Sequence, residues 1–127
     1  MNTTDIMTNN IVTNADLVAW AAKKEAKTVT KLDLSHTQVS DLSPLAGLKQ
    51  LTSLKLWGTK VSDISPLAEL KQLTYLDLFN TNVTDLNPLA GLTQLTHLGL
   101  AGTQVSDVSP LEGLTQLTHL RLWGTLS

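Results

Sequence analysis

The hydrophobic pattern of this chain is dominated by pairs of leucines that are separated by one residue and return every 22 residues. The pairs are Leu32 and Leu34, Leu54 and Leu56, Leu76 and Leu78, Leu98 and Leu100, and Leu120 and Leu122. Around each pair, apolar and polar positions alternate, which is typical of a short strand with one buried face. Because the copies are equal in length, their strands must stack in parallel at a spacing of about 4.8 Å. The pattern therefore predicts an α/β repeat fold whose sheet has about five short parallel strands.

Turn positions repeat with the same spacing and indicate how each copy returns behind the sheet. They are Thr37, Thr59, Thr81, Thr103 and Thr125; Asp41, Asp63, Asp85 and Asp107; and Pro44, Pro66, Pro88 and Pro110. In the second copy, Ser65 is expected to cap a helical or 3₁₀ turn that begins at Pro66 and carries Leu67 and Leu70 inward. No copy can bury its leucines alone, so we expect stacking of the copies to form one continuous core.

The chain before the repeats has a different pattern, which predicts a helix. Thr13 and Asp16 are spaced as a capping box, and Val12 and Leu17 are spaced as a hydrophobic staple. The helix is expected to run to about Ala26. Its last turn would then hold two lysines, which favour the negative end of a helix.

One face of this helix is apolar and is expected to cover the first copy. Leu17, Trp20 and Ala21 share that face, and terminal repeats need such a lid because their leucines are otherwise exposed. We therefore expect the chain to divide into a disordered leader (1–12), a capping helix (13–26) and the repeats (27–127), all in one domain.

The repeated run "LTxLxLxxTxVSDxSPLxxLxxL" resembles the leucine-rich repeats of bacterial internalin-type proteins over roughly residues 26–126. The resemblance implies a leucine-rich-repeat solenoid with a curved parallel sheet, turns on the convex side and a concave face that binds other proteins. The chain departs from the family in one column, where threonine stands in place of the usual asparagine. We expect each threonine hydroxyl to bond to the backbone of the neighbouring turn.

The repeated aspartates and glutamines are interpreted as structural. An aspartate placed two residues before a Ser-Pro turn can accept a hydrogen bond from the backbone amide two residues later. This bond fixes the bend at the start of the turn. A metal or acid–base role is the weaker interpretation, because an ion site needs converging ligands. The same structural role is assigned to Gln50, Gln72, Gln94 and Gln116.

Candidate binding residues lie where the copies differ, at the positions that flank the inward leucines. They are Lys55, Trp57, Tyr75, Asp77, Phe79, His97, His119, Arg121 and Trp123. Exposed large aromatic residues are enriched in binding hot spots. We expect Gly99 and Ala101 to leave a depression between the Phe79 and Trp123 rows. The alternative is that the rings only stack on each other along the sheet.

Two histidines occupy one column in neighbouring copies and raise the question of metal binding. The rings of His97 and His119 should lie about one strand spacing apart, close enough to share a transition metal. There is no cysteine, and Asp77 is only diagonally placed. A pH-sensitive contact surface is therefore favoured over a metal site, and no cofactor is expected.

Composition narrows the classes of function. The net charge is −2, which argues against a nucleic-acid partner. The first ten residues are polar, and no apolar run approaches the ~20 residues of a membrane span. With no cysteine, these features favour a cytoplasmic protein without a membrane partner. No phosphate-binding loop, nucleophile elbow or zinc motif is present, so an enzyme is not expected.

The sequence therefore predicts a protein- or peptide-binding module that uses the concave face. Two alternatives stay open: a carbohydrate-binding module with aromatic platforms, and a fragment of a larger repeat protein. The last copy is followed by no capping element, so a homodimer through that copy is also expected. Its contact residues would be Leu111, Leu114, Leu120, Leu122 and Leu126.

Overall fold

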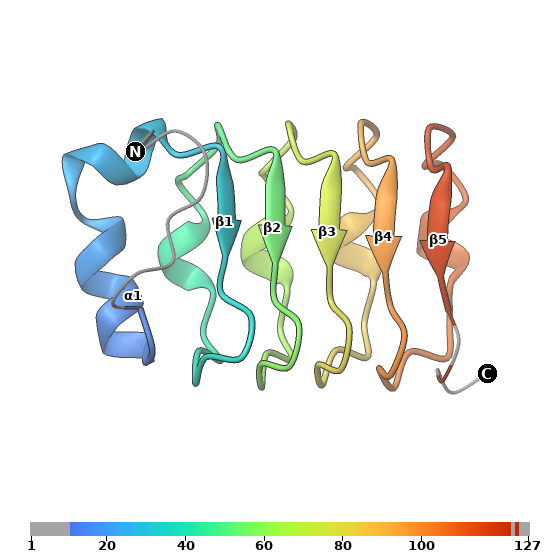
Figure 1. Cartoon of the computed structure of the whole chain (residues 1–127). Helices are drawn as coiled ribbons and strands as arrows, with labels where there is room; N and C mark the ends of the chain where they lie inside the picture. The colour runs from blue at the N-terminus through green and yellow to red at the C-terminus, as the bar shows by residue number, and fades with distance from the viewer. Residues whose placement is uncertain (1–10, 123, 125–127) are drawn as a thin grey trace.

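The computed structural model describes residues 11–122 and residue 124, and its centre is a single parallel sheet of five strands in sequence order. The strands are β1 (Lys31–Asp33), β2 (Ser53–Lys55), β3 (Tyr75–Asp77), β4 (His97–Gly99) and β5 (His119–Arg121). Each residue pairs with the residue 22 positions later, as Leu54 does with Leu76. Figure 1 shows the strands side by side, with α1 beyond β1 at the N-terminal end. The leucine-rich-repeat solenoid predicted from the pattern is confirmed.

The return segments behind the sheet contain short 3₁₀ turns, as predicted. They are η2 (Ser43–Leu45), η3 (Ser65–Leu67), η4 (Asn87–Leu89) and η5 (Ser109–Leu111). Leu67 and Leu70 are fully buried. The prediction for Ser65 needs correction, because the cap position of η3 is Ile64 and Ser65 is the first residue of the turn. Pro66 is therefore the second residue of the turn, where its missing N–H costs no helical hydrogen bond.

The aspartate before each turn plays the structural role expected of it. The backbone amide of Ser65 donates to Oδ1 of Asp63 at 2.9 Å. The same bond, at the same distance, joins Ser43 to Asp41, Asn87 to Asp85 and Ser109 to Asp107. Each carboxylate thus satisfies an amide at the start of a turn that has no partner within it.

These bonds affect the acid–base behaviour of the carboxylates. The backbone amide of Ser65, followed by its hydroxyl, lowers the pKa of Asp63. Ser43 and Ser109 lower the pKa values of Asp41 and Asp107 in the same order. A carboxylate with a lowered folded-state pKa stabilises the fold above its unfolded pKa, which is about 3.9. That stabilisation disappears as the pH falls through the folded-state pKa.

We therefore predict that the free energy of unfolding falls with decreasing pH below about pH 4. Replacing Asp41, Asp63 and Asp107 together with asparagine should flatten this decrease, because a neutral side chain no longer gains a proton. The measurement is urea denaturation from pH 2.5 to pH 7. Glu69→Gln, which removes an exposed carboxylate that accepts none of these bonds, is the matched control. A triple variant with the wild-type pH profile would contradict the assignment.

Two threonine columns stabilise the solenoid, and only one of them was predicted. The predicted column bonds locally rather than to the neighbouring turn: Thr59 donates to the carbonyl oxygen of Leu56 at 2.8 Å. Thr37, Thr81 and Thr103 repeat this bond to the carbonyl three residues earlier. The bonds between copies come from Thr52, Thr74, Thr96 and Thr118, each of which donates to the carbonyl 22 residues earlier.

Of the four glutamines in the repeated column, only Gln50 makes a side-chain hydrogen bond in the described part of the chain. Nε2 of Gln50 donates to the carbonyl oxygens of Ala26 and Val29, at 3.0 and 2.8 Å. Gln72, Gln94 and Gln116 are exposed. The first copy differs because the chain that enters the repeats presents two carbonyls there.

The N-terminal lid has the predicted start and a different end. Thr13 and Asp16 form the capping box, and Leu17, Trp20 and Ala21 are buried. The helix α1 (Asn14–Ala21) has no basic residue in its last turn. It stops five residues before the predicted end, and a separate 3₁₀ helix, η1 (Lys24–Thr28), leads into β1. The break brings Ala26, which is fully buried, into the core.

The residues before α1 also differ from the prediction. Ile11 is buried in the core, whereas the predicted staple residue Val12 is 48% exposed. The carbonyl oxygen of Val12 accepts a hydrogen bond from the amide of Gln38 at 2.7 Å. Residues 11 and 12 therefore belong to the folded unit rather than to the leader, and the rest of the predicted leader lies outside the described residues.

The surface at the β5 end of the sheet exposes only some of the leucines that were expected to form a dimer contact. Leu111 and Leu114 are 8% and 3% exposed, whereas Leu120 is 40% exposed. Leu122 is partly buried, and Leu126 lies outside the described residues. The first two leucines are thus core residues that could contribute little to the contact surface expected at this end. Among the described residues, no helix has the length and apolar character needed to cross a membrane.

Candidate functional site

The open sheet face consists of the strand residues that flank the buried leucines and the residues two positions after each strand, such as Trp57 and Phe79. Its side chains are held at fixed positions because the leucines between them, such as Leu76 and Leu98, are at most 1% exposed. Lys55, Tyr75, Asp77, Phe79 and His97 are half-buried; Trp57, His119 and Arg121 are exposed. Trp123 lies outside the described residues. Apart from Trp123, all the candidate residues from the sequence are thus on one face.

The aromatic and imidazole rings on this face form two rows that cross the strands. One row runs from His36 through Trp57 to Phe79, with ring centroids 4.6 and 5.4 Å apart. The other runs from Tyr75 through His97 to His119, with centroids 5.4 and 4.2 Å apart. Lys55 adds to the second row, because its Nζ lies 5.7 Å from the Tyr75 ring centroid. The stacking that was left open as an alternative is therefore present.

Between the two rows and the last strand lies a hollow of about 230 Å³. It is lined by Tyr75, Leu76, Asp77, Phe79, His97, Leu98, Gly99, Ala101, His119 and Arg121. Gly99 and Ala101 mark the predicted depression. Ala101 lines the hollow as predicted, but it is only 3% exposed, so its expected exposure to solvent was wrong. The methyl group of Ala101 does not reach as far from the sheet as the larger side chains of its column, such as Phe79 one copy earlier.

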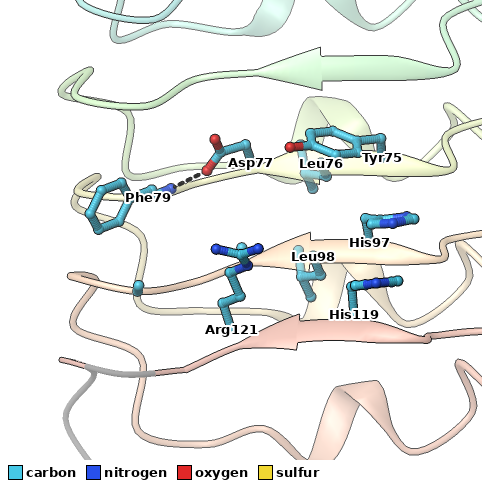
Figure 2. Close-up of a pocket in the computed structure, with 10 residues that line it drawn as sticks. Tyr75, Leu76, Asp77, Phe79, His97, Leu98, His119 and Arg121 are labelled. Carbon is cyan, nitrogen blue, oxygen red and sulfur yellow. Dashed lines mark hydrogen bonds between the residues drawn. The ribbon is translucent and has the colours of Figure 1, made fainter.

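Asp77 and Arg121 face each other across this hollow. Figure 2 shows the side chain of Arg121 extending from β5 over β4 toward Asp77 on β3. One carboxylate oxygen of Asp77, Oδ1, accepts a hydrogen bond from the amide of Phe79 at 2.9 Å. This bond orients the carboxylate, as the equivalent bond from Ser35 orients Asp33 two copies earlier.

Glycine at position 99 keeps the space between these two charges open. A Cβ atom there would lie 3.1 Å from Oδ1 of Asp77, closer than ordinary van der Waals contact. The equivalent positions in the other copies carry Asp33, Lys55, Asp77 and Arg121. The hollow therefore results from one missing side chain in a charged column.

The two stacked histidines are oriented by the threonine ladder. Oγ1 of Thr96 lies 2.8 Å from Nδ1 of His97 and also donates to the carbonyl oxygen of Thr74 at 3.0 Å. A hydroxyl has one proton to donate, so with that proton given to Thr74, Nδ1 of His97 is assigned as the donor in the first contact. Thr118 repeats this arrangement with His119 and the carbonyl of Thr96. In the neutral ring, Nε2 is then the remaining acceptor.

This geometry does not favour a shared metal ion. The rings of His97 and His119 are nearly parallel, with an interplanar angle of 8° and centroids 4.2 Å apart. In parallel rings the nitrogen lone pairs point along parallel lines that do not meet. A single ion at the usual Zn–N distance of about 2.0–2.1 Å therefore cannot lie in line with both lone pairs. Within residues 11–122 and 124, no three histidine, cysteine or acidic side chains are grouped as metal ligands.

Sequence reasoning missed the residues that orient the site. Thr96 and Thr118 hold the two imidazoles, and the left-handed residues after each strand set the path of the chain beside the ring rows. Those residues are His36, Gly58, Asn80, Gly102 and Gly124, with φ between 57° and 76°. The signals were present in the sequence, because the threonines repeat every 22 residues and the left-handed column holds three glycines, one asparagine and one histidine, which are the residue types that favour this conformation.

A second hollow lies on the same face toward the N-terminal end. It has a volume of about 390 Å³, and its lining includes Lys31, Asp33, Lys55 and Tyr75. Tyr75 lines both hollows and separates them. The open sheet face thus offers two adjacent recesses whose side chains differ from copy to copy.

Comparison with known proteins agrees with this architecture. The family profile described as leucine-rich repeats in two copies matches residues 27–69, 49–91 and 71–112. No curated protein sequence matches the chain. Among solved structures, internalin C2 from Listeria monocytogenes is 41% identical, with a TM-score of 0.80. The alignment covers 85% of this chain and 46% of that one.

Two further structures from the same organism are similar. The internalin InlF is 31% identical with a TM-score of 0.67, and the alignment covers 85% of this chain and 37% of that one. The functional domain of InlJ, which includes a cysteine ladder, is 26% identical with a TM-score of 0.65, over 79% and 26% of the two chains. The chain therefore spans less than half the length of each of these proteins. With the profile match and the observed fold, it belongs to the leucine-rich-repeat family, and its repeats are of the internalin type.

Proposed function

We propose that this chain is a recognition module that binds an extended peptide or a loop of another protein on the open sheet face. The observation that carries the proposal is the position of the residues that vary between copies. The repeated residues are committed to the core and the turns, whereas the varied residues gather on one exposed face and line its hollows. In a repeat protein, side chains outside the packing frame are the ones available for a partner.

The dimensions of the face favour a narrow partner. Five strands at about 4.8 Å and four residues at about 3.3 Å give an area of roughly 19 by 13 Å. A standard protein interface takes about 800 Å² from each partner. The hollow around Gly99, at about 230 Å³, is also below the ~300–1,000 Å³ of most small-molecule sites, and the second hollow, at about 390 Å³, is near the lower end of that range. A peptide or a single loop matches these dimensions better than a flat protein surface does.

The ring rows favour peptide binding over carbohydrate binding. A sugar-binding aromatic platform needs a ring face that is available to the sugar. Here the rings of Trp57, Phe79, Tyr75, His97 and His119 stack on one another, so at least one face of each ring is covered by another ring. Edges bearing N–H and O–H groups are suited to the polar atoms of a peptide.

The test is a selection of binding peptides from a random displayed library with the whole 127-residue chain. We expect selected peptides to lose at least tenfold in affinity against Tyr75→Ala and Arg121→Ala, measured by fluorescence anisotropy. Lys49→Ala, an exposed change outside the open sheet face, should leave their affinity unchanged. Peptides that bind all four proteins equally would contradict the proposal.

Two further measurements separate the alternatives. Tryptophan fluorescence is titrated with mixed oligosaccharides, and a saturable change at millimolar sugar would instead support carbohydrate binding. Light scattering at micromolar protein is compared for the wild type and Leu120→Glu. A dimer that dissociates in this variant would support the self-association expected at β5, with the peptide site counted separately.

A further inference from the structure

The polar column nearest the centre of the open sheet face alternates in charge and has one gap. From β1 to β5 the column reads Asp33, Lys55, Asp77, Gly99 and Arg121. Where opposite charges are direct neighbours, as at Lys55 and Asp77, they are one strand spacing apart, about 4.8 Å. Asp77 and Arg121 instead lie two strands apart, with glycine between them. The gap is thus bordered by a carboxylate on one side and a guanidinium on the other.

The two bordering groups do not neutralise each other. Both are described residues, and no ion pair within 4.0 Å joins them. Asp77 uses Oδ1 for the amide of Phe79, and a carboxylate has about four acceptor positions. Arg121 is exposed and carries five N–H donors. The gap therefore presents an acceptor from β3 and donors from β5 to whatever enters it (Figure 2).

The histidines that line the hollow add acceptors rather than donors. Nδ1 of His97 and Nδ1 of His119 are donors to the threonine hydroxyls, which leaves Nε2 as the acceptor of each neutral ring. With neutral imidazoles the hollow thus combines the donors of Arg121 with the acceptors of Asp77 and the two Nε2 atoms.

This arrangement discriminates among ligand side chains by charge. A carboxylate would approach Asp77, and an ammonium would approach Arg121, so each meets one like charge. An apolar side chain would leave both charged groups desolvated and unpaired, which is costly. A carboxamide avoids all three problems, because its NH₂ group supplies two donors and its oxygen accepts, at no net charge.

We propose that the hollow over Gly99 is a carboxamide subsite, which takes an asparagine or glutamine side chain of the bound peptide. The subsite rests on the proposed function, since it is one recess of the same face. The amide NH₂ points to Asp77 and the amide oxygen to Arg121. The volume of about 230 Å³ is that of a side-chain recess rather than of a larger ligand site.

The experiment uses three probes that differ only in the side chain: the N-acetyl, N-methylamide derivatives of asparagine, aspartate and leucine. Each is titrated into the ¹⁵N-labelled full chain at pH 7, and the amide signals of Gly99, Ala101 and Arg121 are followed. We expect the asparagine probe to bind at least tenfold more tightly than the other two. All three probes share the same main-chain amides, so equal binding of all three would overturn the subsite.

Variants identify the groups responsible. Arg121→Gln and Asp77→Asn should each reduce the preference for asparagine over leucine to less than threefold. Asp33→Asn is the matched control, because Asp33 has the same column position and the same backbone bond but lines the other hollow. Asp33→Asn should leave the preference unchanged. A preference that persists in both Asp77→Asn and Arg121→Gln would place the probe elsewhere.

Filling the gap is the steric test. Gly99→Ala should abolish binding of the asparagine probe, whereas Gly113→Ala, where a Cβ meets nothing within 4 Å, should not affect it. Thermal melts of all variants verify folding, and if Gly99→Ala melts early the test rests on Asp77→Asn and Arg121→Gln. A Gly99→Ala chain that is folded and still binds the asparagine probe overturns the proposal.

The outcomes separate the subsite from the general function. If the library peptides bind the open sheet face but the probes show no preference, the subsite is wrong and the recognition module stands. If no peptide binds the open sheet face while the asparagine probe alone binds, the subsite stands as a small-molecule site and the module is wrong.

Discussion

Replacing Leu76 with alanine is expected to lower the free energy of unfolding by about 2–5 kcal/mol. Leu76 is the central residue of β3, and its side chain is fully buried. It is stacked between Leu54 and Leu98, its register partners in the copies on either side. The change removes apolar contacts to both neighbours. It also leaves a cavity that the tightly packed residues around it cannot move to fill. Urea denaturation followed by circular dichroism measures the loss.

The matched control is Leu120→Ala, because Leu120 occupies the same position in β5 and is 40% exposed. It should cost less than half as much as Leu76→Ala, since part of its side chain is already in water. If the two variants lose equal stability, Leu120 is covered in solution, and contact with another surface at β5 would be the reason. If Leu76→Ala costs less than about 1 kcal/mol, the observed register is wrong, because a shift of one residue turns every side chain over.

The second large effect is expected at the left-handed turn after β4. Gly102 has φ of +74°, and a Cβ atom there would lie 2.5 Å from Oδ1 of Asn80. Gly102→Ala therefore combines backbone strain with a steric clash against the equivalent residue of the preceding copy. We expect a loss of roughly 1–3 kcal/mol, the usual cost of a residue held in a sparsely populated conformation. The midpoint of urea denaturation reports it.

Gly47→Ala is the control, because a Cβ atom at position 47 meets nothing within 4 Å and the residue has no positive φ. It should change stability by less than about 0.5 kcal/mol, as most surface substitutions do. Gly102→Asn should recover part of the loss, since asparagine adopts the left-handed conformation more readily than alanine. Equal stability of the alanine variants at 47 and 102 would contradict the backbone explanation.

Much of the candidate site could be predicted because it depends on alternation along a strand. Once Leu76 and Leu98 are assigned to the core, Tyr75, Asp77 and His97 must point to the other face. The repeat length then places His97 beside His119, and their rings are indeed stacked. The depression at Gly99 follows in the same way, because glycine is the one residue that adds no side chain to its column.

What the sequence did not indicate depends on the sizes and positions of groups from different copies. Ala101 belongs to an outward column, yet it is buried, because the exposure of a small side chain is decided by its neighbours. The threonines at 59 and 96 each have several carbonyls within reach, and only the final geometry selects the one in the same turn or in the preceding copy. The helix α1 ends at Ala21 because the chain must turn there to bring Ala26 into the core.

The sequence by itself thus determined the strands, their register, the buried columns and the single face on which the varied residues lie. These features follow from a 22-residue period, and an error of one position would expose every leucine at once. Only the tertiary structure decided the depth of the hollow, the opposed positions of Asp77 and Arg121 and the orientation of the two imidazoles. Those features arise from contacts of a few ångströms between residues that are 22 or 44 positions apart, and no local pattern along the chain encodes such distances.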